Sequence, residues 1–184
     1  WLDASGIRSM PAMLLDLYAD DPVAHHASPL HADLLFDVGN YRSSHNPDLK
    51  NLWIQGGARD RLFFADQPAQ APALNKIPLV KWHWRYAYAS STHALLPRGL
   101  NVVYDQDAAA RPSGLLLHTK LAHNFVQKTR TALERKQHFG SAKEYRAYAQ
   151  GIAHGTQFAG AISHKMCDWR GFEELDLMSR GDWA

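Results

Sequence analysis

The residues with the clearest chemical potential are His118 and Lys120, which follow the apolar run Leu115–Leu117. A short, unbroken apolar run after Pro112 and Gly114 is typical of a buried strand. In open α/β sheets, ligands bind beyond the carboxyl ends of the strands, where the following helix start favours anions. An imidazole and an ammonium group at that place could bind a metal ion and a phosphate. A single histidine without partners at ligand spacing is more often a hydrogen-bonded structural residue, so both interpretations stay open.

Two arginines form a second group with chemical potential. The segment 53–64, WIQGGARDRLFF, contains a glycine pair, which admits unusual backbone angles and the close approach of another group. Arg59 and Arg61 follow that pair, and a planar guanidinium can bind phosphate or carboxylate oxygens through two hydrogen bonds. The two side chains are therefore a candidate clamp for an anionic ligand. The alternative is that both arginines bridge acidic loops.

Two carboxylates lie in or next to predicted strands. Asp16 lies in the apolar segment Met10–Tyr18, which is predicted to be a central strand, and Asp37 follows the short run Leu34–Phe36. A charge buried without a partner is expensive, so Asp16 must pair with another group. That group is either a structural arginine or a substrate hydroxyl.

Three predicted strands must position these side chains. The segments around Met13, Leu79 and Leu116 are expected to lie in one mixed sheet. Pro78 places the second of them at an edge or a bulge, because proline cannot donate to the ladder. The continuous run Leu115–Leu117 predicts a strand that is covered on both faces.

Two helices are predicted after the last of these strands. From Leu121 the apolar residues follow a 3.6-residue period, which predicts a basic helix over Leu121–His138. Ser141 can cap a second helix, Ser141–Gln150, with Glu144 at the capping-box position. The residues expected to pack the first helix on the sheet are Phe125, Val126 and Leu133.

The composition is that of an ordinary globular chain. Its 184 residues are enough for one domain with a core, and a hydrophobic content of 46% argues against disorder. The net charge of +2 is too small to indicate a nucleic-acid partner. Cys167 is the only cysteine, so no internal disulfide can form and a cytoplasmic location is expected. No apolar run approaches the ~20 residues of a membrane span, and Trp1 in place of methionine suggests the later part of a longer protein.

Five segments carry a resemblance to a known family. None of the HExxH, zinc-finger, GxSxG, P-loop or GxGxxG patterns occurs in the chain. The segments are PAMLLDLYAD at 11–20, GGARDRLFF at 56–64, LNKIPLVKW at 74–82, SSTHALLP at 90–97 and GLLLHTKLAHNFVQKTRTALERKQH at 114–138. In this order and spacing they resemble the later half of bacterial glycosyltransferases of the family 2 type, in the subgroup with a transferase domain for glycan polymers or lipopolysaccharide.

This resemblance implies the GT-A fold, a Rossmann-like mixed sheet flanked by helices. It also implies the transfer of a sugar from a nucleotide-sugar donor to a hydroxyl of a glycan or a lipid-linked acceptor, as in cell-surface polysaccharide synthesis. Residues 1–184 would form the C-terminal, acceptor-side part of one such domain, with the N-terminal half absent. The fragment alone is then expected to be inactive.

The resemblance further implies a divalent metal, Mn or Mg, that bridges the donor diphosphate. Family members bind it through an Asp-x-Asp motif in their first half, and a late histidine completes the site in many of them. His118 is the best match to that histidine, and His93 is second. The string Asp105–Asp107 comes too late in the chain and is expected to be a solvated turn. The cofactor is therefore expected only together with the missing half.

The resemblance also implies that charged side chains bind the donor diphosphate and act as the catalytic base. Arg59, Arg61 and Lys120 would neutralise the diphosphate leaving group, where fixed positive charge contributes most. An inverting enzyme also needs a carboxylate base on the acceptor hydroxyl, and Asp37 and Asp16 are the candidates.

Two other functions stay open. A non-catalytic carbohydrate- or anion-binding domain would use the aromatic residues of segment 82–88 and the basic helix. A basic module could instead contact membrane surfaces or nucleic acid through segment 120–136. Three measurements would distinguish these functions. Turnover of a nucleotide sugar would indicate the transferase, and glycan binding without turnover the binding domain. Salt-dependent binding to anionic lipid or nucleic acid would indicate the basic module.

Overall fold

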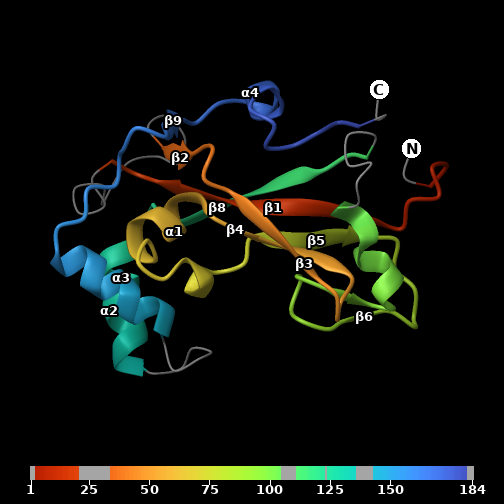
Figure 1. Cartoon of the computed structure of the whole chain (residues 1–184), viewed down its shortest axis with the longest axis horizontal. Coiled ribbons are helices and arrows are strands. Elements are labelled where there is room, and N and C mark those ends of the chain that lie inside the picture. The colour runs from red at the N-terminus through yellow and green to blue at the C-terminus, as the bar shows by residue number, and fades with distance from the viewer. Residues whose placement is uncertain (1–2, 21–33, 105–110, 123, 136–142, 182–184) are drawn as a thin grey trace.

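The computed structural model describes residues 3–20, 34–104, 111–122, 124–135 and 143–181. Its centre is a five-stranded mixed sheet around β1 (Ser9–Tyr18) (Figure 1). β1 pairs antiparallel with β5 (Asn75–Val80) and parallel with β8 (Gly114–Leu121). At its carboxyl end it pairs with β2 (Leu35–Asp37), which in turn pairs antiparallel with β9 (Ser163–Lys165). The strands predicted around Met13, Leu79 and Leu116 therefore lie in one mixed sheet, as expected.

Two small hairpins and four α-helices complete the described part of the chain. The hairpins are β3 (Arg42–Asn46) with β4 (Asn51–Gln55), and β6 (Ala87–Tyr88) with β7 (Leu95–Leu96). The helices are α1 (Gly57–Phe63), α2 (Phe125–Arg135), α3 (Lys143–Ala153) and α4 (Trp169–Glu174), with short 3-10 turns at Pro68–Gln70 and Arg98–Tyr104. This arrangement confirms the predicted mixed α/β class. None of the described helices is long and apolar enough to cross a lipid bilayer.

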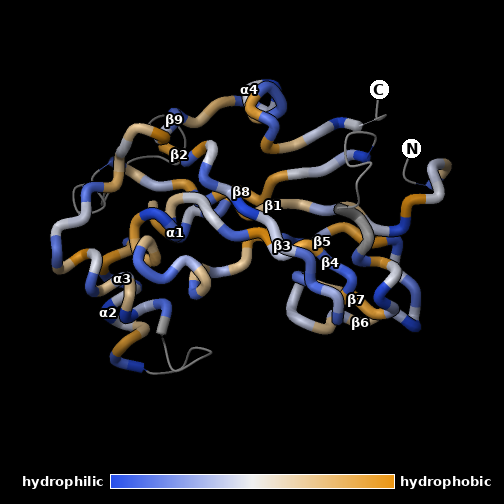
Figure 2. Tube along the Cα trace, viewed as in Figure 1, coloured by the Kyte–Doolittle hydropathy of each residue, from blue (hydrophilic) through white to orange (hydrophobic). Residues whose placement is uncertain are grey.

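Side chains alternate between the two faces of β1, and the two faces pack in different hydrophobic clusters. Leu15 and Leu17 pack with Phe36 and Phe172 in one hydrophobic cluster. Tyr18 points the other way, into a second cluster that contains residues of α1, α2 and α3, and Asp16 shares its face because strand side chains have a period of two. Figure 2 shows mostly hydrophobic colour on β1 and on the first half of β8, and hydrophilic colour along β3. From Pro11 to Leu17 one face of β1 is therefore apolar, whereas the other carries Asp16 and Tyr18.

The expectation that β8 is covered on both faces is wrong. In the described part of the chain β8 pairs only with β1, so it lies at an edge of the sheet. Leu117 is 46% exposed, whereas its register partner Leu15 is 0% exposed. A continuous apolar run therefore marks a strand here without showing that both of its faces are buried.

The expected position of His118 and Lys120 beyond a strand end is also wrong. β8 continues to Leu121, so both residues lie within the strand, two positions apart, and the register with β1 is irregular between His118 and Leu121. The following helix begins at Phe125, four residues later than the apolar period predicted. Leu121 is the last residue of β8 and not the first of the helix. Hydrophobic periodicity alone does not show which of the two elements an apolar residue at such a junction belongs to.

The edge position of Pro78 is confirmed. β5 is the last strand on its side of the sheet, and Pro78 is exposed. The register of β5 on β1 shifts between the pairs Met10 with Leu79 and Ala12 with Lys76, so a bulge lies at the proline. Both features fit a residue that cannot donate a ladder hydrogen bond.

Helix α2 packs through Phe125, as predicted. This side chain is 1% exposed, and its ring centroid lies 5.3 Å from that of Tyr148 and 6.1 Å from that of Phe158. The other buried residues of the helix are Thr129 and Ala132, whereas the predicted Val126 and Leu133 are only half-buried. In Figure 1, α1, α2 and α3 gather at one end of the sheet. His138 and Ser141 lie outside the described residues.

The paired residues Leu15 and Leu117 provide a test of this sheet. Leu15→Ala should lower the free energy of unfolding by about 2–5 kcal/mol, because it leaves a cavity in a closed cluster. Leu117→Ala should cost less than ~1 kcal/mol, because the side chain already faces solvent. Urea unfolding of the two variants measures both values, and equal losses would contradict the edge position of β8.

Candidate functional site

The buried carboxylate of Asp16 is the centre of a polar cluster. It accepts a hydrogen bond from Arg59 Nε to Oδ2 at 2.7 Å and lies 2.7 Å from His118 Nδ1 through Oδ1. Asp16 is only 2% exposed and Arg59 only 4%. The expectation that Asp16 needs a partner is confirmed, and that partner is an arginine.

Local backbone geometry explains how these three side chains meet. Asp16 and His118 are register partners on β1 and β8, so their side chains share one face. Arg59 reaches that face because α1 begins at a tight approach of Gly56 to the preceding loop. Gly56 has φ 132°, and a Cβ there would lie 2.4 Å from the carbonyl oxygen of Asn40. Only glycine fits such a contact at this backbone angle.

Glu144 joins the cluster from α3. Its Oε1 accepts hydrogen bonds from Lys120 Nζ at 2.7 Å and from the Tyr148 hydroxyl, and it lies 3.4 Å from Arg59 Nη1. The Lys120 ammonium also lies 4.6 Å from the ring centroid of Tyr145. We call Asp16, Arg59, His118, Lys120, Glu144 and Tyr148 the Asp16 cluster.

Glu144 and Tyr148 were not predicted as site residues. The capping-box position of Glu144 indicated only a local role at the start of its helix. It did not indicate the contacts of Glu144 with Lys120 and Arg59. Only the packing of α3 on α1 brings Glu144 to Lys120 and Arg59. The predicted site residues Asp16, Arg59, His118 and Lys120 are brought together as one group.

Charge pairing keeps both carboxylates of the Asp16 cluster ionised. Burial by itself raises the pKa of Asp16, but the Arg59 charge and the His118 hydrogen bond outweigh it and hold the pKa below its usual value. Burial likewise raises the pKa of Glu144, and the charge of Lys120 with its hydrogen bond reverses the shift. For Arg59, burial lowers the pKa, but the attraction of Asp16 more than compensates, so the guanidinium stays charged.

His118 has one ring nitrogen committed and one available. With Asp16 ionised, Nδ1 carries the proton that it donates to Oδ1, and Nε2 is the nitrogen left for another partner. No described residue pairs with Nε2, and the side chain is 29% exposed. A carboxylate behind a neutral imidazole fixes the ring orientation and the tautomer, with the lone pair on the outer nitrogen. His118 Nε2 can therefore accept a proton or bind an electrophile.

The described residues do not form a metal site on their own. Both oxygens of Asp16 already accept a hydrogen bond, one from Arg59 and one from His118 Nδ1. Within the described ranges, no group of three or more His, Cys, Asp and Glu residues could hold a metal. The Asp105–Asp107 string lies outside these ranges.

His93, the second predicted metal ligand, has both ring nitrogens engaged. Nδ1 lies 2.7 Å from the carbonyl oxygen of Asn75, and Nε2 lies 3.0 Å from Lys76 Nζ. Burial lowers the pKa of His93, and the positive charge of Lys76 lowers it further. The structure thus pairs His93 with Lys76 and His118 with Asp16, and does not pair the two histidines with each other.

Asp37 and Arg61, predicted as base and diphosphate ligand, bind each other. Arg61 donates from Nε to Oδ2 at 2.7 Å and from Nη2 to Oδ1 at 2.9 Å, in a two-pronged ion pair. The Tyr18 hydroxyl donates to Asp37 Oδ1 at 2.5 Å and lies 2.5 Å from Ser163 Oγ. Asp37 is 0% exposed. This second group lies beside the Asp16 cluster, because Tyr18 is two residues from Asp16 on the same face of β1.

One donor of the Asp16 cluster has no hydrogen-bond partner. Arg59 Nη2 is buried, and none of the described residues accepts from it. A buried donor without an acceptor costs about 1–3 kcal/mol, so this atom is a place where an anionic oxygen or a water molecule would be favoured.

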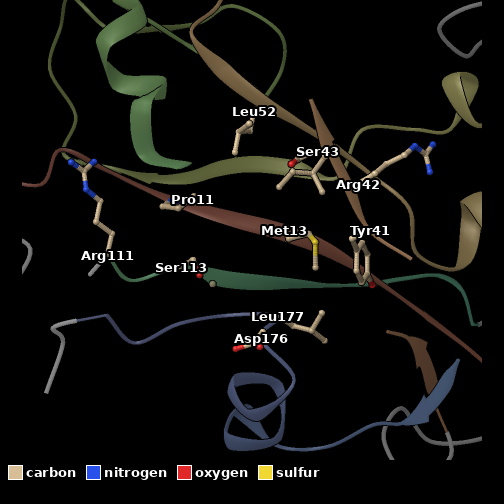
Figure 3. Close-up of a pocket in the computed structure, with 12 residues that line it drawn as sticks. Pro11, Met13, Tyr41, Arg42, Ser43, Leu52, Arg111, Ser113, Asp176 and Leu177 are labelled. Carbon is tan, nitrogen blue, oxygen red and sulfur yellow. The ribbon is translucent and has the colours of Figure 1, made fainter. Parts of the chain in front are cut away.

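A separate hollow of about 300 Å³ lies along the other face of β1 (Figure 3). Pro11 and Met13 contribute its floor, and their odd positions place them opposite Asp16 in the pleat. Tyr41 and Leu177 close its sides, and Arg111 lies at one end (Figure 3). The hollow contains none of the predicted site residues, and no pattern in the sequence indicated it.

A double-mutant cycle tests the ion pair at the centre. Asp16→Asn and Arg59→Gln should each lower the free energy of unfolding by about 3–5 kcal/mol, because each leaves one buried charge without its partner. The double variant should lose clearly less than the sum. The exposed pair of Lys81 and Asp3 is the control, with little or no coupling. Additive losses at Asp16 and Arg59 would contradict the pairing.

The buried His93 predicts a pH dependence of stability. Because its pKa is lower in the folded chain than in the unfolded one, the unfolded chain binds more protons as the pH falls through ~6.5. Stability should therefore decrease between pH 7.5 and about pH 5.5, and His93→Gln should flatten this part of the profile. The exposed His154, replaced by Gln, is the matched control and should leave the slope unchanged. Thermal melting at several pH values measures this slope. An unchanged slope in His93→Gln would show that His93 is not the cause of the pH dependence.

Comparison with known proteins identified no relative of this chain. No protein-family model, no curated protein and no solved structure matches the chain. The Asp16 cluster is therefore the starting point for its function.

Proposed function

We propose that this chain is part of a glycosyltransferase that moves a sugar from a nucleotide-sugar donor to an acceptor hydroxyl. The observation that carries the proposal is the Asp16 cluster, in which an imidazole with an available Nε2 and a fixed ammonium group are joined through Asp16, Arg59 and Glu144. The resemblance of five ordered segments to family 2 glycosyltransferases independently supports the same reaction.

The reaction makes three demands on the protein. The bond between the anomeric carbon and the diphosphate oxygen breaks, and a bond from that carbon to the acceptor oxygen forms. The acceptor hydroxyl loses its proton to a base, and negative charge grows on the departing nucleoside diphosphate. A transferase therefore needs a positioned base and fixed positive charge near the leaving group.

Arg59 and Lys120 are the proposed diphosphate-binding residues. Arg59 Nη2 is a buried donor without an acceptor among the described residues, so a phosphate oxygen would satisfy it. Lys120 is held in place by Glu144 and the ring of Tyr145, which limits the reorganisation needed on binding. Arg61, the third predicted ligand, is bound to Asp37, so it is the least available of the three.

His118 is the proposed base, with Asp16 as its positioning residue. Asp16 and Asp37 were the predicted bases, but each is enclosed and already hydrogen-bonded. An acceptor hydroxyl could instead donate its proton to His118 Nε2, while the ionised Asp16 stabilises the imidazolium that forms. As the other proposed role, His118 contributes one ligand to the divalent metal, Mn or Mg, that the resemblance implies.

The finer assignments belong to the same proposal. They are the GT-A fold, the acceptor-side position of the chain in a longer domain, a glycan or lipid-linked acceptor and a cytoplasmic location. The second candidate is a non-catalytic anion- or carbohydrate-binding domain. It is favoured by the pairing of all four permanent charges of the Asp16 cluster, which leaves little net charge to drive catalysis.

His118→Ala tests the proposed role of the imidazole in the full-length protein. Release of nucleoside diphosphate from a panel of nucleotide sugars should fall about 10²-fold, because a positioned general base contributes at least that much. The free energy of unfolding should fall by about 1–3 kcal/mol, since one oxygen of the buried Asp16 carboxylate loses its donor. The exposed His154, replaced by Ala, should change neither quantity.

The two roles of His118 differ in their dependence on pH and on metal. A base predicts that the acid limb of the rate profile disappears in His118→Ala, whereas a metal ligand predicts a higher metal concentration for half-maximal rate. Wild-type turnover with His118→Ala would contradict both roles. Tight binding of a nucleoside diphosphate without any turnover would favour the binding-domain alternative.

A further inference from the structure

The segment between β5 and β6 exposes an unusual amount of aromatic surface. Trp84 is 76% exposed, Trp82 61% and Tyr88 39%. In Figure 1 this segment lies beside β6, at the end of the molecule opposite α1, α2 and α3. Large exposed apolar groups that lie together commonly mark an interaction site.

These rings hold one another in one continuous patch. The Trp82 centroid lies 6.4 Å from Tyr86 and 6.5 Å from Tyr88. His83 links Tyr86 at 5.4 Å to Trp84, on which it stacks at 5.7 Å. We call residues 82–88 the aromatic patch. Its ring contacts limit the freedom of the side chains, so binding a partner would cost less conformational entropy.

The charged side chains supplied by the segment of the aromatic patch and its flanks are all basic. The Arg85 guanidinium lies 4.6 Å from the ring centroid of Trp84. The stretch from Gln67 to Tyr104 contains no Asp or Glu and carries Lys76, Lys81, Arg85 and Arg98. Asp3, which pairs with Lys81, is an acidic residue that reaches this region from elsewhere in the chain. The patch is therefore complementary to an anionic partner.

The side chains of the patch fit a lipid surface better than a sugar or a nucleic acid. Between Lys76 and Arg98 there is no Asn, Gln, Asp or Glu, so the amide and carboxylate groups suited to bonding sugar hydroxyls are missing. Leu79, in the adjoining β5, is 46% exposed and adds an aliphatic surface that base stacking would not use. Tryptophan and tyrosine with neighbouring cations are the residues enriched where membranes meet water.

We infer that the aromatic patch, with Leu79 and Lys81, binds the face of a bilayer that contains anionic lipids. The rings enter the headgroup region, and Arg85 faces the lipid phosphates, whereas Lys81 is paired with Asp3. The surface predicted for membrane contact, segment 120–136, is a different one: Lys120 lies in β8, and Lys136 is outside the described residues. The inference does not depend on the proposed glycosyltransferase activity.

Trp169 offers a matched control within the same chain. It is 41% exposed, and Arg170 and Arg180 lie over its ring at 4.5 and 5.4 Å. Asp168 and Glu173 pair with those two arginines, so this aromatic and cationic group is neutralised. Exposure and cation contact are thus similar at the two places, whereas the local charge differs.

The test is co-sedimentation of the whole chain with vesicles of phosphatidylcholine alone or mixed equally with phosphatidylglycerol. The chain should bind the mixed vesicles and bind the neutral ones much less. Trp82→Ser with Trp84→Ser should lower the partition coefficient at least roughly tenfold, because two large apolar side chains no longer enter the bilayer. Arg85→Ala should lower it about fivefold on the mixed vesicles only. Trp169→Ser should have no effect.

Several results would overturn the inference. They are the absence of binding to the mixed vesicles, an equal loss with Trp169→Ser, and binding of a single-stranded oligonucleotide or a soluble glycan through Trp82 and Trp84 without vesicle binding. Thermal melting of each variant checks that it is folded. Because all three tryptophans are exposed, the melting temperatures should stay close to that of the wild-type chain.

Discussion

The buried charge of Asp16 is the constraint on which the arrangement around β1 depends. Taking a carboxylate out of water costs several kcal/mol unless partners compensate. Asp16 therefore needs Arg59 on one oxygen and His118 on the other, which ties α1 and β8 to β1 at one point. The same requirement fixes the imidazole tautomer that leaves Nε2 available.

A second buried carboxylate, Asp37 in β2, is also paired with an arginine. Asp37 in β2 binds Arg61, which is two residues from Arg59 on α1. One short helix thus supplies both arginines and connects two strands that share only one pair of register partners. Such fixed charges need little reorganisation when a charged ligand arrives, which is the property that a transferase would use. The helix is short, so its position is held by ion pairs and packing more than by its own hydrogen bonds.

The chain divides its polar and aromatic surfaces between two ends. The Asp16 cluster lies where α1 and α3 cover the sheet, and its charges are paired and largely buried. The aromatic patch lies at the opposite end and is exposed, with cations that are less fully balanced. A chain that binds a surface at one end and a soluble ligand at the other can hold its site at a constant distance from that surface.

Residue type and spacing in the sequence determined the three main strands of one mixed sheet, the edge position of Pro78 and the packing of Phe125. They also singled out Asp16 as a charge within an apolar segment, Arg59 through the glycine pair before it, and His118 and Lys120 through the apolar run that they follow. Only the tertiary structure decided the pairings: Arg61 with Asp37, His93 with Lys76, and Glu144 with Lys120. It also showed that β8 is an edge strand and that His118 lies within it. The reason is that local sequence reports propensity and periodicity, whereas burial on a second face and the choice among charged partners depend on contacts between residues far apart in the chain.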